Sequence, residues 1–256
     1  MIRAADINGR VLYSEGKHQF IWLGADEDEN DEAVQANQYL VVHNGKATLF
    51  DPGGVHLFAR VASAVSQYVG LDQIESIIYS HQDPDVSSGI ALWMGITKAK
   101  VYISELWVRF LPHFGIIDQS RIIAIEKTGR RLPTEAGLQF VPAHFLHSTG
   151  NFTVYDQAAK ALFSADIGTA VFEKSTQYLF VEDFEKHVPL MEPFHRRYMA
   201  SNIALRKWVE IVSRLDVKMI LPQHGALFQD AMVGRFLAWL KELKCGVDLI
   251  DSIYEA

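Results

Sequence analysis

The most informative segment of the sequence is Ile77-Ile78-Tyr79-Ser80-His81-Gln82-Asp83-Pro84-Asp85. Residues 77–80 carry no charge and include two β-branched isoleucines, which predicts a buried strand. His81, Asp83 and Asp85 follow at once, and three such groups are costly to bury without a counter-ion. The stretch therefore predicts a strand that ends at a metal site.

The spacing of these three residues fits two ions rather than one. His81 and Asp83 are two positions apart, so on an extended loop their side chains project to the same side and can bind one ion. Asp85 then reaches a second ion about 3.5–4 Å away, the usual separation in two-metal sites.

Other strand ends repeat this layout, in which apolar residues precede His or Asp and small residues follow. The segments are His144-Phe145-Leu146-His147, Ser164-Ala165-Asp166, Gln223-His224-Gly225 and the turn Asp51-Pro52-Gly53. Side chains at strand ends can converge on one sheet edge although they are distant in sequence. Imidazole suits iron and zinc, and carboxylates add harder oxygen donors that can bridge two ions. Three histidines and three carboxylates at such positions suggest a dinuclear metal site.

Strands and helices interleave along the whole chain, with no Pro/Gly/Ser-rich linker between them. Asn44-Gly45 predicts a hairpin between residues 39–43 and 47–50. Further strands are expected at 101–103, 121–125, 138–143, 152–155, 161–163 and 219–221, and helices at about 54–68, 88–96, 190–215 and 231–254. This order predicts a single α/β domain over residues 1–256, with C-terminal helices from about residue 190 and helices outside a layered β core.

Composition excludes several classes of protein. Lys and Arg total 24 against 31 for Asp and Glu, a net charge of −7 that lacks the basic field nucleic-acid binding needs. The single cysteine, Cys245, excludes an internal disulfide and any multi-cysteine metal site, and we expect it to pack as a small apolar residue in the final helix. Charges among the first ten residues and the lack of a long apolar run predict a cytoplasmic protein without a membrane span.

These motifs resemble the successive metal motifs of the metallo-β-lactamase superfamily. The resemblance rests on His81-x-Asp83-x-Asp85, His147-Ser148-Thr149-Gly150, Asp166 and His224, with Asp51-Pro52-Gly53 similar to the first motif, and it covers roughly residues 21–225. It implies a four-layer αββα sandwich with the metals at one edge. The usual second motif, H-x-H-x-D-H, differs here because Asp83 replaces the second histidine and Val86 the last.

An acidic residue at that position resembles the flavodiiron proteins, which bind two irons and reduce oxygen or nitric oxide. The closer resemblance is to the oxygen-binding diiron proteins, a flavodiiron-like branch with an H-x-D-x-D motif and no flavodoxin domain. The resemblance implies that metal 1 takes His81, Asp83 and His147, that metal 2 takes Asp85 and His224, and that Asp166 bridges both. Val86 cannot coordinate, so metal 2 keeps an open position for a diatomic ligand.

The charge of the donor set also favours iron. Two divalent ions bring about +4 and the three carboxylates return about −3, against about −2 in a typical zinc hydrolase site of this superfamily. The extra negative charge stabilises the oxidised metal and raises the pKa of a bridging water, which disfavours hydrolysis. We therefore expect two iron ions, with zinc or manganese as alternatives, and no flavin within this chain.

Three functions compete at this stage. The first is a non-haem diiron protein that binds O2 or NO and either senses the gas or reduces it with electrons from another protein. The second is a dinuclear metal-dependent hydrolase of phosphodiesters or thioesters, which Asp83 and Val86 disfavour. The third is a non-catalytic interaction module, which the six competent ligand positions disfavour. Whether the protein is an enzyme stays open, and the amphipathic segments after Leu190 offer a surface for a homodimer.

The histidines outside the predicted ligand set are expected to have structural or solvent-facing roles. His147 is favoured over His144 as a ligand because Ser-Thr-Gly follows it, which leaves His144 as a support for a ligand or a buried hydrogen-bonding residue. His113, His187 and His195 are expected to face solvent or to cap helices.

Overall fold

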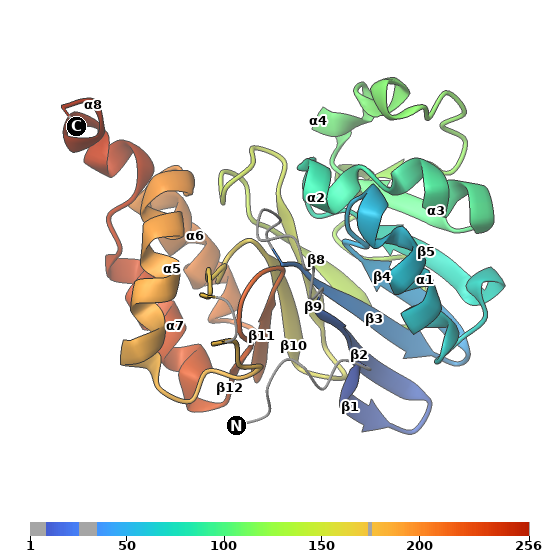
Figure 1. Cartoon of the computed structure of the whole chain (residues 1–256), viewed down its shortest axis with the longest axis horizontal. Helices are drawn as coiled ribbons and strands as arrows, with labels where there is room; N and C mark the ends of the chain where they lie inside the picture. The colour runs from blue at the N-terminus through green and yellow to red at the C-terminus, as the bar shows by residue number, and fades with distance from the viewer. Residues whose placement is uncertain (1–8, 26–34, 174–175, 256) are drawn as a thin grey trace. The chain divides into compact units, whose positions relative to one another are not determined.

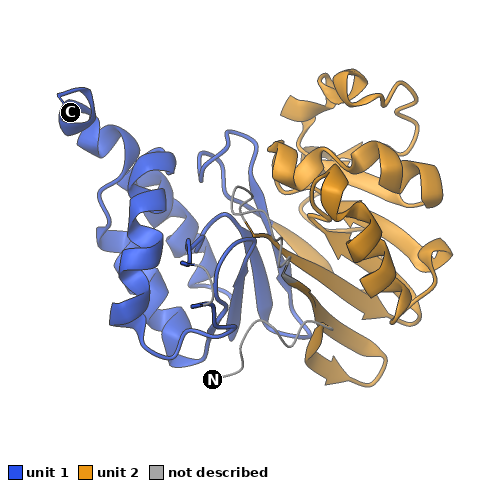
Figure 2. Cartoon of the chain, in the orientation of Figure 1, with its two compact units in different colours: residues 1–4, 141–256 blue, residues 5–140 orange. Residues whose placement is uncertain are grey.

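The structure, a computed structural model, describes residues 9–25, 35–173 and 176–255. The chain divides into two compact units, which Figure 2 shows in different colours. Unit 2 runs up to Phe140, and unit 1 starts at Val141. Each unit has its own β-sheet, helices and apolar core. That the two units form one domain over residues 1–256 remains a prediction.

Unit 2 is built on a sheet of seven strands in sequence order (Figure 1). The first four pair antiparallel, whereas the fourth to the seventh pair parallel. The strands are β1 (Arg10–Glu15), β2 (His18–Ala25), β3 (Asn37–His43), β4 (Lys46–Phe50), β5 (Ile74–Ile78), β6 (Lys100–Ile103) and β7 (Ile122–Ala124). Since β4 and β5 are parallel, the residues that follow them, Asp51 and Ser80, lie at the same edge of this sheet.

The predicted hairpin is confirmed between β3 and β4. Asn44 and Gly45 have φ angles of 50° and 73°, the left-handed values that a two-residue turn of type I′ requires. The turn sets the register, in which His43 pairs with Lys46 and Tyr39 with Phe50. Tyr39 and Phe50 are fully buried, so this register also fixes which side chains enter the core.

Short helices cover the sheet of unit 2. Phe58 on α1 packs edge-to-face on Trp93 of α3, with ring centroids 5.1 Å apart. Val61 and Val65 on the buried side of α1 are fully enclosed, and each such side chain contributes about 1.5–3 kcal/mol to folding. The helices are η1 (Val55–Leu57), α1 (Phe58–Ser66), η2 (Leu71–Gln73), α2 (Pro84–Ser87), α3 (Ile90–Ile96), α4 (Glu105–Val108), η3 (Leu111–Phe114) and η4 (Ile125–Thr128).

Unit 1 is built on a five-stranded sheet in the order β12-β11-β10-β9-β8. Its strands are β8 (Leu138–Pro142), which runs across the boundary of the units, β9 (Phe152–Asp156), β10 (Ala161–Ala165), β11 (Met219–Pro222) and β12 (Phe228–Gln229). β10 pairs antiparallel with β9 and parallel with β11. Because β10 and β11 are parallel, Asp166 and His224, which follow them, lie at one edge of this sheet.

Helices α5 (Phe184–Tyr198), α6 (Asn202–Val212) and α7 (Ala231–Glu242) lie together beside this sheet (Figure 1). The prediction of one helix over 190–215 is wrong, because the Ser201 hydroxyl accepts from the Ala204 amide and starts a new helix at Asn202. The prediction of one helix over 231–254 is also wrong. It consists of α7, η5 (Gly246–Leu249) and α8 (Ile250–Tyr254).

The break after α7 has a steric cause. Gly246 has a φ of 52°, and an added Cβ would lie 2.2 Å from the carbonyl oxygens of Met199 and Ala200. Cys245 therefore precedes η5 and does not lie within a helix, although it is buried as predicted. Burial, with a contribution from Asp248, raises the pKa of its thiol to about 12, so the thiol is unreactive near neutral pH.

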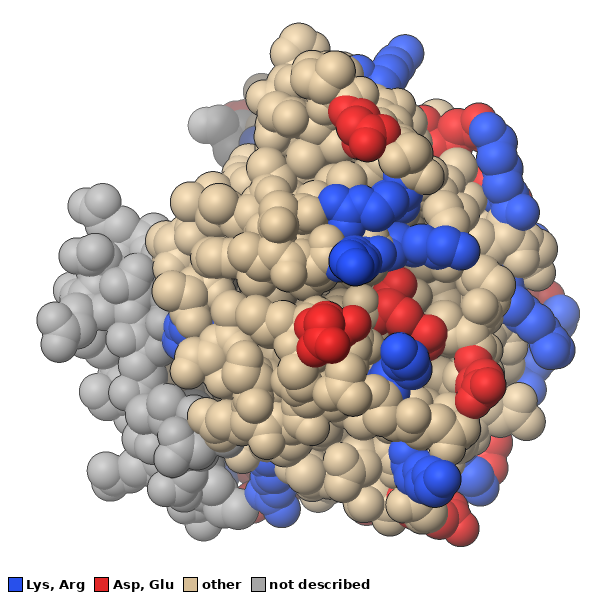
Figure 3. Space-filling model, turned by 90° about the vertical axis from the view of Figure 1, so that its right-hand side faces the viewer, with Lys and Arg blue, Asp and Glu red and all other residues tan. Residues whose placement is uncertain are grey.

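Two observations bear on the expectations about membrane insertion and nucleic-acid binding. Among the described residues no helix is both long and apolar enough to cross a bilayer. The face drawn in Figure 3 carries Lys and Arg side chains interspersed with Asp and Glu, without an extended basic field.

Candidate metal centre

In unit 2, His81 is held by a chain of hydrogen bonds that starts at Asp51. The Ser80 hydroxyl donates to Oδ2 of Asp51 at 2.5 Å, and the Ser80 amide donates to Oδ1 at 2.8 Å. Nδ1 of His81 lies 2.8 Å from the same hydroxyl oxygen. Because the hydroxyl proton goes to Asp51, Nδ1 is the donor, and Nε2 keeps its lone pair. Metal-binding histidines are oriented in this way, with the ring nitrogen opposite the metal donating to a polar partner.

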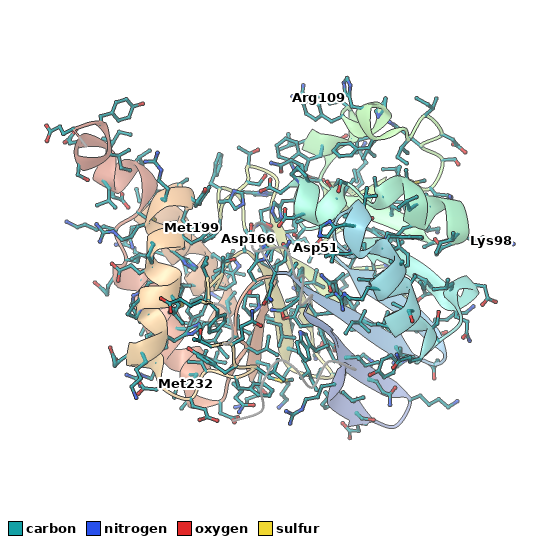
Figure 4. All side chains as sticks on the ribbon, viewed as in Figure 1. Asp51, Lys98, Arg109, Asp166, Met199 and Met232 are labelled. Atoms are coloured by element: carbon teal, nitrogen blue, oxygen red, sulfur yellow. The ribbon has the colours of Figure 1, made fainter. Side chains whose placement is uncertain are left out.

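These hydrogen bonds lie at the edge of the unit 2 sheet. Asp51, labelled in Figure 4, follows β4, and its amide donates to the carbonyl oxygen of Ile78 in β5 at 2.9 Å. Asp51, Ser80 and His81 are all buried. The motif Asp51-Pro52-Gly53 thus acts through the orientation of His81.

A Ser80→Ala variant is expected to bind metal about 10- to 100-fold more weakly, because His81 loses its fixed tautomer and ring orientation. The measurement is competition for ferrous iron against a chromophoric chelator under anaerobic conditions. Ser76→Ala, at a buried serine of the preceding strand, is the control. Equal losses of affinity in the two variants would contradict this role.

Asp83 and Asp85 flank the start of the short helix α2. Oδ2 of Asp83 lies 3.7 Å from Nε2 of His81. Oδ1 of Asp83 accepts from the side-chain amide of Gln82 at 3.1 Å. Pro84 starts the helix, with Asp85 in its first turn, and both carboxylates are partly exposed. Asp83 and His81 therefore present a carboxylate and an imidazole to the same point, as the spacing predicts.

Unlike the partly exposed carboxylates of Asp83 and Asp85, the Val86 side chain points into the protein. Its side chain is 0% exposed and belongs to the apolar core of unit 2. The amides of Val86 and Ser87 both donate to the carbonyl oxygen of Asp83, so the first turn of α2 fixes this orientation. The side chain at position 86 packs in the core and takes no part in metal binding.

In unit 1, the Asp166 carboxylate lies between two imidazoles. Oδ2 is 2.7 Å from Nε2 of His147, and Oδ1 is 3.5 Å from Nε2 of His224. Asp166 follows β10 (Figure 4) and is 3% exposed. Each oxygen of this carboxylate lies near a different imidazole, which is the arrangement of a bridging ligand.

The backbone around His224 is tightly constrained. Gly225 has a φ of 91°, and a Cβ there would lie 2.7 Å from the Cβ of Ala170. The Gln223 amide donates to the carbonyl oxygen of Ala165 at 2.8 Å, which ties the end of β11 to the end of β10. The short connection through glycine therefore sets where His224 lies relative to Asp166.

His147 is flanked by aromatic rings of α5. Its ring contacts Phe194 and Tyr198 edge-to-face, with centroids 6.0 and 5.9 Å away. His144 is exposed and packs against Phe152. The expectation that His144 is buried is therefore wrong, and its role as a support for a ligand stays a prediction. His147 is the member of the pair beside Asp166.

His187 and His195 correct the expectation of solvent-facing histidines, since both are 0% exposed on the inner side of α5. Nδ1 of His187 lies 2.6 Å from the Tyr178 hydroxyl oxygen, and Nε2 of His195 accepts from the Gly168 amide at 2.9 Å. Burial lowers the pKa of each to about 4, with a smaller contribution from His195 in the case of His187. His113 is exposed, as predicted.

His187 makes stability depend on pH. Its pKa is about 4 in the folded protein and about 6.5 in the unfolded chain, so unfolding takes up a proton between these values. This contribution is present above pH 6.5 and is lost as the pH falls toward 4. Between pH 7 and pH 5 the wild type is expected to lose about 2 kcal/mol more unfolding free energy than His187→Leu.

The measurement is urea unfolding at both pH values with a chelator present. His113→Leu, at an exposed site, is the control and should follow the wild type. Equal pH dependence in wild type and His187→Leu would contradict a neutral buried imidazole.

The donors of both units fit a metal. Asp166 is a buried carboxylate between two imidazole nitrogens, and a bound cation supplies the charge that such burial needs. His81 is oriented through Nδ1, and its Nε2 lies 3.7 Å from Oδ2 of the Asp83 carboxylate. Mixed imidazole and carboxylate donors suit iron, manganese and zinc, with softer thiolate sites excluded by the single buried cysteine.

Sequence reasoning missed three supporting residues. Ser80 is a common residue type, and only its place directly before His81 marks it. His195 and Phe194 lie far from the motifs, and their relation to Asp166 and His147 arises from the packing of α5.

Comparisons with known proteins give a matching family model and similar solved structures. The family model described as ODP family beta lactamase matches residues 34–225. A structure described as the peroxy diiron species of chemotaxis sensor ODP is 52% identical, with a TM-score of 0.83 over 96% of this chain and 99% of that chain. The apo state of chemotaxis sensor ODP from T. denticola is 51% identical, with a TM-score of 0.81 over 96% and 98% of the two chains.

The solved structures matched at lower identity share the fold alone. A flavo di-iron protein mutant from Thermotoga maritima is 21% identical, with a TM-score of 0.76 over 91% of this chain and 60% of that chain. An uncharacterized protein of Methanocaldococcus jannaschii is 20% identical in an alignment of 240 positions that covers 86% of this chain and 57% of that protein. The chain thus spans little more than half the length of that curated relative. The expected α/β metallo-β-lactamase-like fold, with two mixed sheets and flanking helices, is confirmed.

Proposed function

Because this chain belongs to the ODP family of beta-lactamase-fold proteins, we propose that it is a non-haem diiron protein that binds dioxygen and acts as a chemotaxis sensor. The observation that carries the proposal is the similarity to the sensor whose structure is described as a peroxy diiron species, at 52% identity over 99% of that chain. The buried Asp166 carboxylate between His147 and His224 supports it from this chain's own geometry.

The irons would be held by the six residues whose pattern the sequence presents. One iron would take His81, Asp83 and His147, the other would take Asp85 and His224, and Asp166 would be shared by both. The support comes from each unit separately: His81 and Asp83 address one point in unit 2, and Asp166 contacts both imidazoles in unit 1. When bound, a pair of ferrous ions supplies electrons for reversible binding of dioxygen.

The chain's own residues prepare the site for that role. Ser80 and Asp51 hold His81 with Nε2 available. The three carboxylates contribute about −3 of charge, which stabilises the oxidised metal relative to the reduced one. Val86 lies in the core and supplies no donor, so an iron bound beside it would keep a position for the gas.

Sensing requires an output, which we assign to an interaction with a signalling protein of the chemotaxis system. The support is that both close relatives are described as chemotaxis sensors and are almost fully covered by this chain. A sensor needs a stable oxygen complex and no electron donor for turnover.

The test is anaerobic reconstitution with ferrous iron, metal counting, and stepwise addition of oxygen. The expected result is two irons per chain and a visible absorption band that saturates at one oxygen per pair of irons. Zinc- and manganese-loaded samples serve as controls, and zinc should give no band. An unchanged spectrum with both irons loaded, or turnover of a chromogenic phosphodiester, would contradict the proposal.

A further inference from the structure

The loop that follows Asp166 is anchored to helix α5. The Gly168 amide donates to Nε2 of His195 at 2.9 Å, and the Val171 amide donates to the carbonyl oxygen of Leu190 at 3.0 Å. Between them, the Ala170 amide donates to the carbonyl oxygen of His224 at 3.4 Å. Three amides within four residues of this loop are thus held by α5 or by a predicted metal ligand.

His195 uses both of its ring nitrogens in this arrangement. Nδ1 lies 2.7 Å from the carbonyl oxygen of Met191, which can only accept, so Nδ1 carries the proton. Nε2 therefore presents its lone pair to the Gly168 amide. The ring is fully buried, and its low pKa keeps it neutral near pH 7, so this tautomer persists.

The turn held by His195 is narrow. Gly168 has a φ of 108°, and an added Cβ would lie 3.1–3.3 Å from Phe228 and Pro222. The Thr169 amide also donates to the carbonyl oxygen of Asp166 at 3.0 Å, which closes the turn on the carboxylate residue. A displacement of the Gly168 amide therefore moves Asp166 as well.

We propose that His195 is a positioning residue for Asp166: by accepting from the Gly168 amide it fixes the turn that directs one carboxylate oxygen to His147 and the other to His224. The inference rests on the proposed function only in that Asp166 binds metal. The neighbouring residue, Phe194, packs on His147, so two adjacent residues of α5 position a carboxylate and one of its imidazole partners.

The experiment compares three variants of the full chain. His195→Leu removes the acceptor, and His195→Gln retains an oxygen that can accept from Gly168 and an amide that can donate to Met191. His187→Leu is the matched control, because His187 lies on the same helix, is equally buried, and makes its hydrogen bond to Tyr178 instead. The readouts are ferrous iron affinity by chelator competition, melting temperature of the metal-free chain, and hydrogen exchange of the Gly168 amide.

His195→Leu is expected to weaken iron binding about 10- to 100-fold and to speed exchange at Gly168, whereas His195→Gln should stay closer to the wild type. His187→Leu should lower the melting temperature without a comparable loss of iron affinity. Equal iron affinity in His195→Leu and wild type, with Asp166→Asn deficient, would overturn the inference alone. Equal affinity in wild type and Asp166→Asn would instead overturn the metal-binding function.

Discussion

Asp166→Asn is expected to abolish the paired metal site and the oxygen-dependent absorption band. The substitution replaces one of two carboxylate oxygens by an NH2 group, which cannot bind a cation and would face the nitrogen of His147 or His224. It also removes one negative charge. Since loss of a supporting residue typically costs 10- to 100-fold in affinity, loss of a bridging ligand should cost more than about 100-fold.

The measurement is iron stoichiometry and affinity after anaerobic reconstitution, followed by exposure to oxygen. Asp156→Asn is the matched control, because Asp156 is also buried in unit 1 but ends β9, where it pairs with the first residue of β10 and accepts from the amides of Ala158 and Ala159. Two tightly bound irons in Asp166→Asn would show that this carboxylate is not a ligand.

Iron loading is expected to raise the melting temperature by about 10 °C or more. A ligand at about 1,000 times its dissociation constant stabilises the folded state by about 4 kcal/mol, and each kcal/mol shifts the melting point of a chain of this size by about 2–4 °C. The gain arises because the cation compensates the buried Asp166 carboxylate and the neighbouring acidic groups, which the unfolded chain exposes to water.

Calorimetry of the iron-loaded and chelator-treated chain measures this shift directly. Asp166→Asn provides the internal control, since its metal-free form lacks the same buried charge and should gain little from iron. An equal gain in wild type and Asp166→Asn would place the stabilising ions elsewhere on the chain.

The strand-end pattern made the candidate site predictable from the sequence. Few residue types bind metals, and few arrangements of strands bring them to sheet edges, so His81, Asp166 and His224 could be recognised without coordinates. The hairpin was predictable for a similar reason, because Asn44-Gly45 is one of few pairs that accept two left-handed φ values.

The helix boundaries in the C-terminal third of the chain were less predictable, because apolar periodicity continues through positions where the backbone turns. The break before α6 depends on the Ser201 cap, and the break after α7 depends on the contact of Gly246 with the 199–200 carbonyls. The buried histidines did leave a signal. Phe184, His187, Met191 and His195 recur at intervals of three, four and four residues, a helical stripe in which histidine takes the place of an apolar residue.

The inward-facing Val86 side chain limits what a substitution at this position can do. A single codon change to histidine would bury a ring in the valine, isoleucine and tryptophan core of unit 2 rather than add a donor to the metal. Adding that donor requires a rotation of the α2 turn and compensating changes beneath it. The number of protein donors therefore depends on the packing of α2, and a histidine at position 86 would add a donor only if the side chains beneath this helix were replaced at the same time.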